Sequence, residues 1–416
     1  MDIFTPYGRP FYVTAKPVGA RCNLRCEYCY YLEKSDLYPR PASATTMDDE
    51  TLTIFIRDYI RAQPSTDVVF TWHGGEPLLR PLKFYEHVIE LQTRFSEGHN
   101  IINCLQTNGT LINDDWGRFL HDNNWLTGIS IDGPQRLHDK YRLARDGQPS
   151  FEKVMRGIEI LNRHAAEWNA LAVVNRFNGD HPMEFYDFFR QTGCRYIQFT
   201  PVVERLRRDG HLASLADDGN FGVTEFSVTP EQWGKFLCAL FDEWVQHDVG
   251  EYYIQLFDAT LANWAGVEPP VCTMAPTCGH AIAMEFNGDV YCCDHFVFPE
   301  YLLGNIRNKT FADMMFSSKQ RRFGADKRRL LPDQCKQCRY LFACNGECPR
   351  NRFAATASGQ PHLNYLCSCY RRFFEHAAPY MEFMKRELDA QRPPANVMEA
   401  IRNQELQAPS ASAAAQ

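Results

Sequence analysis

The sequence predicts an α/β fold: a partial (β/α)6 barrel of the TIM-barrel type, followed by a C-terminal cysteine-rich domain. Strand-like and helical segments alternate through the first 250 of the 416 residues, and such alternation implies parallel strands joined by right-handed crossovers. Ten of the 16 cysteines lie within residues 272–369, which indicates a second region built around thiols. The same alternation also fits a doubly wound sheet. Of these two arrangements, we expect the partial barrel.

The predicted elements follow one another along the chain. β-Branched and aromatic residues typical of strands occur in residues 11–18, 67–73, 100–108, 126–132, 169–175 and 196–202. Helical periodicity, with Asp, Ser or Pro near several starts, predicts helices over residues 48–62, 81–96, 113–123, 150–166 and 182–192. An irregular insertion is expected over residues 203–228, before an amphipathic helix at 230–247 and a further βα unit that ends near Gly266.

These elements divide the chain into four expected parts. The barrel takes residues 1–250 and the cysteine-rich domain residues 251–370. A C-terminal helix is expected within residues 371–400, from a helical pattern between about Tyr370 and Ala390. The last part, residues 401–416, ends in APSASAAAQ and is expected to be disordered.

Composition excludes several classes of function. A net charge of −7 and the lack of a long basic run argue against nucleic acid as the main partner. No apolar run reaches 18 residues and the start, MDIFTPYGRP, does not resemble a signal peptide, so we expect a cytoplasmic protein without a membrane partner. Thiols in a reducing compartment serve metals or redox chemistry more often than disulfides. Cys104, Cys194 and Cys238 stand among apolar neighbours and are interpreted as ordinary buried residues.

Three cysteines form the first cluster. Cys22, Cys26 and Cys29 have C-x3-C-x2-C spacing directly after the first predicted strand. Three thiolates on one loop can bind three irons of a [4Fe–4S] cluster and leave the fourth iron open to a small ligand. The spacing alone also allows a zinc site completed by a distant histidine.

Polar residues at the ends of later strands are candidates for ligand binding, because barrel enzymes carry their chemistry there. Gly74, Gly75, Glu76 and Pro77 follow the second strand, and Asn108 and Ser130 lie at the ends of the next two. Arg142 could clamp a carboxylate through two parallel hydrogen bonds. A strand-terminal Asn or Ser caps a following turn at least as often as it binds a ligand.

The second cysteine region supplies enough thiols for two further four-coordinate clusters. Its spacing reads Cys272-x5-Cys278, Gly288-x4-Cys293 and C-x2-C-x5-C-x3-C from Cys335 to Cys348, with Cys367 and Cys369 nearby. The C-x2-C and C-x3-C pairs on their own would also suit a zinc ribbon.

At these motifs the chain resembles the radical S-adenosylmethionine superfamily. Its C-x3-C-x-aromatic-C loop, with Tyr28 as the aromatic residue, and its GGEP sequence are shared with that superfamily. The resemblance implies S-adenosyl-L-methionine on the open iron, where one electron from the cluster releases a 5′-deoxyadenosyl radical. It also implies that Tyr28, Gly74, Gly75, Glu76 and Pro77 belong to the cofactor-binding set, to which the strand-end candidates Asn108, Ser130 and Arg142 are added.

The second cysteine region resembles the SPASM domain, a C-terminal extension with two auxiliary [4Fe–4S] clusters. By that resemblance the first auxiliary cluster is held by Cys272, Cys278, Cys293 and Cys348, and the second by Cys335, Cys338, Cys344 and Cys367. Cys369 could replace Cys367, and Cys292 stands beside Cys293. With the first loop, this makes three [4Fe–4S] clusters.

Within that class the chain resembles the anaerobic sulfatase-maturating enzymes over nearly its full length. The resemblance is carried by KPVGARCNLRCEYCYYLEK, TWHGGEPLL, LQTNGTLIN, SIDGP and VYCCDHFVFPEYLLGNI. It implies oxidation of a cysteine or serine side chain in a C/S-x-P-x-R peptide to Cα-formylglycine. The implied partners are an unfolded or nascent sulfatase polypeptide and an electron donor such as flavodoxin or ferredoxin.

Two residues are expected to act in that reaction. Asp294, next to Cys293, resembles the family's general base, and a hydroxyl becomes much more acidic once its carbon bears a radical. Tyr31 matches a family tyrosine near the substrate and is expected to orient that carboxylate. A solvated turn is the alternative role for Asp294, and core packing is the alternative for Tyr31.

Two rival functions share much of this pattern. Another SPASM radical enzyme, one that crosslinks or dehydrogenates a different peptide, would use the same cysteines. A zinc-stabilised binding module is the rival that is not an enzyme.

Overall fold

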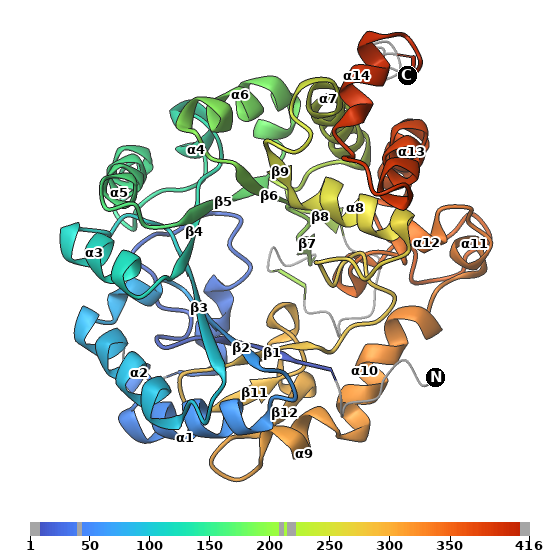
Figure 1. Cartoon of the computed structure of the whole chain (residues 1–416). Coiled ribbons are helices and arrows are strands. Elements are labelled where there is room, and N and C mark those ends of the chain that lie inside the picture. The colour runs from blue at the N-terminus through green and yellow to red at the C-terminus, as the bar shows by residue number, and fades with distance from the viewer. Residues whose placement is uncertain (1–8, 40–43, 208–211, 214–221, 408–416) are drawn as a thin grey trace.

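A computed structural model describes residues 9–39, 44–207, 212–213 and 222–407. Ten of its strands form one sheet, and helices surround that sheet on the outside (Figure 1). The strands are β1 (Tyr12–Ala15), β2 (Asp67–Trp72), β3 (Asn100–Thr107), β4 (Leu126–Ser130), β5 (Trp168–Val174), β6 (Tyr196–Pro201), β7 (Arg205–Leu206), β8 (Gly222–Val223), β9 (Tyr253–Ile254), β10 (Ala281–Met284), β11 (Asp289–Tyr291) and β12 (Leu302–Asn305).

The order of strands distinguishes the two predicted arrangements. The sheet runs β12-β11-β10-β1-β2-β3-β4-β5-β6-β9, so β1 to β6 are neighbours in chain order. All pairs from β10–β1 to β6–β9 are parallel. In a doubly wound sheet the order of the strands reverses at a switch point. Here β1 to β6 follow one another in one direction around the sheet, without such a reversal. The predicted α/β partial barrel is therefore confirmed.

The helices that periodicity predicts over residues 48–62, 81–96, 113–123, 150–166, 182–192 and 230–247 are present, and the structure adds helices that were not predicted, most of them in the cysteine-rich region. Several begin with a side-chain cap: Asp48 accepts a hydrogen bond from the Thr51 amide, and Asn113 accepts one from the Trp116 amide. The α-helices are α1 (Asp49–Ala62), α2 (Leu82–Phe95), α3 (Asp114–Asp122), α4 (Gln135–His138), α5 (Phe151–Arg163), α6 (Pro182–Thr192), α7 (Pro230–His247), α8 (Gln255–Ala265), α9 (Phe311–Met315), α10 (Ser318–Arg329), α11 (Asp333–Lys336), α12 (Leu341–Cys344), α13 (Cys367–Asp389) and α14 (Asn396–Arg402).

The seventh βα unit and the insertion before it also follow the prediction. Within residues 203–228, the described part contains only the two-residue strands β7 and β8. β9 adds to β6, and α8 ends at Gly266, whose φ of 73° suits a left-handed C-cap. Because β9 and α8 continue the barrel, the expected boundary at residue 250 falls inside a continuous sheet.

Three short strands of the cysteine-rich region extend the sheet beyond β1. β10 pairs with β1 in parallel, and β11 and β12 follow in antiparallel pairs. These strands are three or four residues long and are not among the elements that the sequence predicts. They bring the cysteine-rich region against the first strand of the barrel.

The C-terminal end of the described chain differs from the expected tail. α13 begins at Cys367, three residues earlier than its periodicity predicts. Residues 401–402 were placed in a disordered tail but belong to α14, where Ile401 is buried. That placement is wrong, because the apolar side of α14 packs into the main core. Residues 408–416 lie outside the described part.

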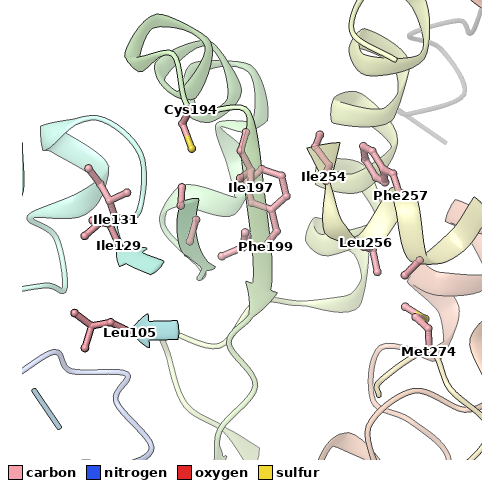
Figure 2. Packing of buried hydrophobic residues seen from close by; sticks show 14 of the residues in the cluster. Leu105, Ile129, Ile131, Cys194, Ile197, Phe199, Ile254, Leu256, Phe257 and Met274 are labelled. Carbon is pink, nitrogen blue, oxygen red and sulfur yellow. The ribbon is translucent and has the colours of Figure 1, made fainter. Parts of the chain in front are cut away.

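One hydrophobic core joins the barrel to the cysteine-rich region. Labelled residues of β4, β6 and α8 in Figure 2, together with Met274 of the cysteine-rich region, belong to this core. Cys194 is buried in this core, as its apolar neighbours predict. No helix in the described part of the chain is long and apolar enough to span a bilayer.

Candidate functional site

The glycines of the GGEP motif allow the first cysteine loop to lie against the end of β2. A Cβ atom on Gly75 would lie 2.0 Å from the carbonyl oxygen of Arg21, and one on Gly74 would lie 3.0 Å from that of Gly19. The amides of Gly75 and Glu76 donate to the carbonyls of Gly19 and Arg21 at 2.8 and 2.7 Å. Only glycine permits this approach, so the motif fixes the backbone that leads into Cys22.

Glu76 is buried and bound on both carboxylate oxygens. Oε1 accepts from the Leu78 amide and the Thr107 hydroxyl at 2.9 and 2.7 Å, and Oε2 accepts from the Asn108 amide at 2.8 Å. Burial raises the pKa of Glu76 to about 7, although these three donors act against the rise. The side chain therefore ties the end of β2 to the end of β3.

The first cysteine group is formed by Cys22, Cys26 and Cys29. Burial, with a contribution from the nearby Cys29 thiol, raises the pKa of Cys22 to about 11 and that of Cys26 to about 12. Cys26 and Tyr28 belong to one small apolar cluster, against which Cys22 and Cys29 also pack. Buried thiols that face one another are suited to a shared cationic centre, which would stabilise their thiolate forms.

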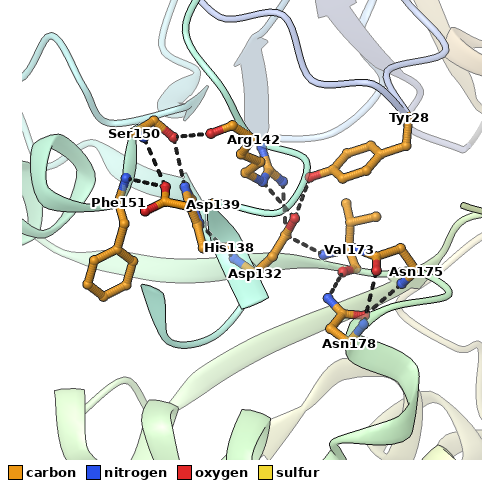
Figure 3. Close-up of polar contacts among 10 residues, drawn as sticks. All are labelled: Tyr28, Asp132, His138, Asp139, Arg142, Ser150, Phe151, Val173, Asn175 and Asn178. Atoms are coloured by element: carbon orange, nitrogen blue, oxygen red, sulfur yellow. Dashed lines mark hydrogen bonds and ion pairs between the residues drawn. The ribbon is translucent and has the colours of Figure 1, made fainter. Parts of the chain in front are cut away.

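Tyr28 and Arg142 meet at Asp132 (Figure 3). Arg142 donates to both carboxylate oxygens of Asp132, at 2.9 and 3.1 Å, and the Tyr28 hydroxyl donates to Oδ2. The Val173 amide donates to Oδ1 at 2.8 Å. Two nitrogens of Arg142, the residue expected to clamp a cofactor carboxylate, thus bind the carboxylate of Asp132 in the same chain.

Asn108 and Ser130 lie at strand ends as predicted. The side-chain nitrogen of Asn108, Nδ2, donates to Oδ1 of Asn23 at 2.9 Å and lies 3.7 Å from the sulfur of Cys22. The side-chain oxygen of Asn108, Oδ1, caps the next turn by accepting a hydrogen bond from the Thr110 backbone amide. Ser130 is the last residue of β4 and is partly buried. Asn108 thus combines the capping role with contact to the cysteine loop.

A second cysteine group is formed by Cys272, Cys278, Cys293 and Cys348. Burial raises the pKa of Cys293 well above its ordinary value, and the nearby thiols of the other three raise it further. The group borders a cavity of about 1000 Å³, whose lining includes Cys272, Cys278, Cys348 and His295.

A third group is formed by Cys335, Cys338, Cys344 and Cys367, which together line a separate cavity of about 460 Å³. Cys369 is not in that lining; its Cβ faces Gly234 of α7, where an added Cβ would lie 3.2 Å away. Cys292 is fully buried, and its carbonyl accepts a hydrogen bond from Gln320. Cys367 therefore lines this cavity, whereas Cys369 faces α7, although its thiol also interacts with that of Cys344.

Asp294 lies in a short 3₁₀ turn (Asp294–Phe296) after β11, with a partner on each carboxylate oxygen. Nζ of Lys16 lies 2.5 Å from Oδ1, and the Tyr30 hydroxyl donates to Oδ2 at 2.5 Å. Burial acts to raise the pKa of Asp294, but Lys16, His73 and His295 together hold it well below its ordinary value. The carboxylate is thus anionic and retains 24% exposure of its side chain.

Tyr31 does not bind Asp294, which corrects the expected orienting role. Its hydroxyl donates to Glu285, and its ring covers Lys16, whose Nζ lies 3.5 Å from the ring centroid. Because the two adjacent tyrosine side chains point to different partners, Tyr30 takes the position expected for Tyr31. Tyr30 is itself packed between His295 and Arg350.

Two imidazoles complete the surroundings of Asp294. Burial and the charge of Lys16 lower the pKa of His73 to about 4, and burial and Arg350 lower that of His295 to about 4. Among the described residues, Nδ1 of His73 and Oε2 of Glu285 are buried without a hydrogen-bond partner. These polar atoms remain available to a bound ligand.

Sequence reasoning missed several of these residues. Lys16 could have been selected from its position, because a lysine at the end of a buried strand requires a charged or polar partner. His73 and Asp132 stand at strand ends whose motifs were noted, but they were not selected. Tyr30 carried no signal that distinguishes it from Tyr31.

The three cysteine groups differ from the geometry of a single-ion site. Within the described residues, no three His, Cys, Asp or Glu side chains converge on the position of one metal ion. The second and third groups instead border cavities of about 1000 and 460 Å³. Buried thiols around such a volume fit an iron–sulfur cluster.

Comparison with known proteins connects this site to established chemistry. The model of the Radical SAM superfamily matches residues 17–189, and that of SPASM, an iron–sulfur cluster-binding domain, matches residues 272–339. Both predicted resemblances are thereby confirmed. The match over residues 272–339 also favours iron–sulfur clusters over the zinc alternatives.

Relatives match the chain over almost its whole length. It is 58% identical to a serine-type anaerobic sulfatase-maturating enzyme of Bacteroides thetaiotaomicron, over 97% of this chain and 98% of that protein. It is 32% identical to a cysteine-type anaerobic sulfatase-maturating enzyme of Clostridium perfringens, over 89% of this chain and 97% of that protein. The solved structure of native anSMEcpe with bound AdoMet and Cp18Cys peptide superposes with a TM-score of 0.80 at 30% identity, covering 91% of this chain and 100% of that one.

Proposed function

We propose, on the premise that this chain belongs to the family of anaerobic sulfatase-maturating enzymes, that its preferred substrate residue is serine. The enzyme is a radical S-adenosylmethionine oxidoreductase that converts a cysteine or serine side chain of a sulfatase peptide to Cα-formylglycine. The preference for serine is supported by the 58% identity to one serine-type enzyme, whereas two further serine-type relatives are 33% identical and the cysteine-type relatives 32%.

The cysteine groups are the proposed ligands of three [4Fe–4S] clusters. Cys22, Cys26 and Cys29 would hold the cluster that binds S-adenosyl-L-methionine, and the two groups of four would hold the auxiliary clusters. When bound, these cofactors supply the radical that removes a hydrogen atom and an acceptor for one further electron. Cys367 is favoured over Cys369, and Cys293 over Cys292, because the favoured thiol of each pair is the one near the other three.

Residues at the strand ends would bind S-adenosyl-L-methionine. Gly74 to Pro77 would contact it through backbone groups, because the Glu76 carboxylate is already bound by three donors. Asn108 and Ser130 would add polar contacts. Tyr28 and Arg142 would act indirectly, since their joint hydrogen bonding to Asp132 fixes the cysteine loop.

Asp294 is the proposed general base, and its two partners support this role. Conversion of serine CH2–OH to an aldehyde removes two electrons and two protons: one hydrogen atom from Cβ, one further electron and the hydroxyl proton. Asp294 would accept the hydroxyl proton once Cβ has lost its hydrogen atom, because that loss makes the hydroxyl more acidic. Lys16 and Tyr30 hold the carboxylate in one orientation, with 24% of the side chain left accessible.

The proposed partners and location follow from this chemistry. The substrate is an unfolded or nascent sulfatase polypeptide, because a side chain has to reach Asp294 inside the barrel. A flavodoxin or ferredoxin would provide electrons. All 16 cysteines are free thiols, which supports a reducing cytoplasm as the place of action.

Mass spectrometry of a modified peptide tests this function. Reduced, cluster-reconstituted enzyme and S-adenosyl-L-methionine are incubated with two peptides that differ only in serine or cysteine at the first position of the motif. We expect the serine peptide to lose two hydrogens and to react faster than the cysteine peptide. Loss of water from the serine peptide, a crosslink, or faster reaction of the cysteine peptide would contradict the proposal.

The variant Asp294→Asn tests the base. It should cleave S-adenosyl-L-methionine and form little aldehyde. Aldehyde formation at the parent rate would remove Asp294 from this role.

A further inference from the structure

Helix α10 carries an exposed arginine surface on an otherwise acidic chain. Its sequence, SKQRRFGADKRR, has six basic residues and one acidic residue, whereas the whole chain has a net charge of −7. At 3.6 residues per turn, one side of the helix presents four arginines, and all four are exposed. We call this surface the arginine face; it consists of Arg321, Arg322, Arg328 and Arg329.

The opposite side of α10 is bonded to the second cysteine group. The Cys278 amide donates to the carbonyl of Gly324 at 3.2 Å. Nζ of the buried Lys327 donates to the carbonyls of Cys272 and Thr273 at 2.5 and 2.8 Å. α10 is therefore bonded directly to the backbone of two expected cluster ligands, Cys272 and Cys278.

The cysteine group also reaches the surface next to the arginine face. Cys272 is exposed, unlike the other three members of its group. Arg328 borders the same cavity as Cys272 and Cys278. A partner bound to the arginine face would thus lie close to the outer edge of this group.

Most of the charge on the arginine face is not neutralised within the chain. Arg329 pairs with Asp326 at 2.6 Å. In the described part of the chain, no acidic side chain pairs with Arg321, Arg322 or Arg328. Leu330, which is 37% exposed, adds an apolar contact at the end of the helix. Guanidinium groups bind carboxylates strongly, so this surface suits an acidic protein.

We propose that the arginine face of α10 is the docking site of an acidic protein electron carrier, which exchanges one electron with the cysteine group behind the helix. The inference rests on the proposed function. Serine oxidation leaves one electron beyond the abstracted hydrogen atom. The carrier's flavin or iron–sulfur centre would accept it, be reduced by one electron, and then provide the one electron that cofactor cleavage consumes. Weak, charge-steered contacts are typical of such transient electron-transfer complexes.

Association kinetics of the holoenzyme with flavodoxin test the docking site. The double variant Arg321→Glu/Arg322→Glu is compared with Lys153→Glu/Arg156→Glu, a matched change on exposed residues of α5, which lies far from α10 in Figure 1. At low salt, we expect the α10 variant to associate at least about tenfold more slowly than the parent, with a weaker salt dependence. The α5 variant should keep the parent rate constant. Equal association by all three proteins would overturn the proposal.

Turnover with a chemical reductant separates this inference from the proposed function. With dithionite and the serine peptide, the α10 variant should form aldehyde at the parent rate. If the parent itself forms no aldehyde, the proposed function fails, whatever the association rates are. If the variant keeps peptide turnover but loses turnover of a full-length unfolded sulfatase, the arginine face binds substrate and the docking proposal is overturned.

Discussion

Nζ of Lys16 lies 2.5 Å from a carboxylate oxygen of Asp294, so the end of the first strand holds the proposed base. The Lys16 side chain is completely buried. A buried ammonium needs a counter-charge, and a buried carboxylate needs a cation. Each residue therefore explains why the other is tolerated in the interior.

Replacing Lys16 with methionine should destabilise the protein strongly. Removal of one partner of a buried ion pair costs about 3–5 kcal/mol, and the partial exposure of Asp294 places the expected loss near the lower value. Anaerobic urea unfolding measures it. Arg57→Ala, which breaks the half-exposed pair with Asp58, is the control and should cost less than about 1 kcal/mol. Equal losses in the two variants would mean that Lys16 has no special partner.

Tyr30→Phe should impair product formation more than Tyr31→Phe. Only Tyr30 donates to Asp294, and a hydrogen bond to a charged group contributes about 1.5–3 kcal/mol. Its loss should reduce aldehyde formation about tenfold or more, while cleavage of S-adenosyl-L-methionine continues. The measurement is the ratio of aldehyde to cleaved cofactor. A larger fall of this ratio in Tyr31→Phe would restore Tyr31 as the orienting residue.

Gly75→Ala should prevent assembly of the first cluster. The new Cβ would lie 2.0 Å from the Arg21 carbonyl oxygen, so the backbone before Cys22 has to move. Iron and sulfide analysis after reconstitution should show the loss of one cluster's content. Gly222→Ala is the matched control, because no atom of the described residues lies within 4 Å of its added Cβ. Full iron content in Gly75→Ala would show that the loop adjusts.

His138 should make stability depend on pH. It is fully buried; its Nδ1 faces the Asp132 amide and its Nε2 faces the Ser150 hydroxyl, so the neutral ring is satisfied at both nitrogens (Figure 3). Burial lowers its pKa from 6.5 to about 3. Between these values the unfolded chain binds a proton that the folded chain does not, so stability falls as the pH falls.

The free energy of unfolding, measured against pH, tests this dependence. The His138 contribution should amount to about 2 kcal/mol between pH 7 and pH 5. His138→Asn should lose this part of the slope, whereas a change at the exposed His87 should keep it. Parallel curves for parent and His138→Asn would contradict the prediction.

The barrel could be predicted because its signals are local. Strands β1 to β6 are runs of β-branched and aromatic residues, and the helices between them have clear periodicity and caps. β10 to β12 could not be predicted in this way, because three or four residues carry no period and their stability comes from pairing with β1. Ile401 was misplaced for a similar reason, since its packing partners are distant in sequence.

The site was predictable in its chemistry and less so in its contacts. Cysteine spacing and the GGEP motif indicate which groups are present. The partners of Arg142 and of the two adjacent tyrosines depend on the path of the loop, and no local pattern encodes that path. The fit between Asp132 and Arg142 appears only when β4 and the segment after α4 are in place.

The parallel pairing of β1 with β10 has a consequence for synthesis of the chain. Residues 12–15 leave the ribosome early, but their neighbours at 281–284 follow only after most of the chain has been made. Until then one edge of β1 lacks its partner, and Lys16 lacks the counter-charge of Asp294. The first strand therefore reaches its final surroundings late in translation, and Lys16 can hold the proposed base only after residue 294 has been added.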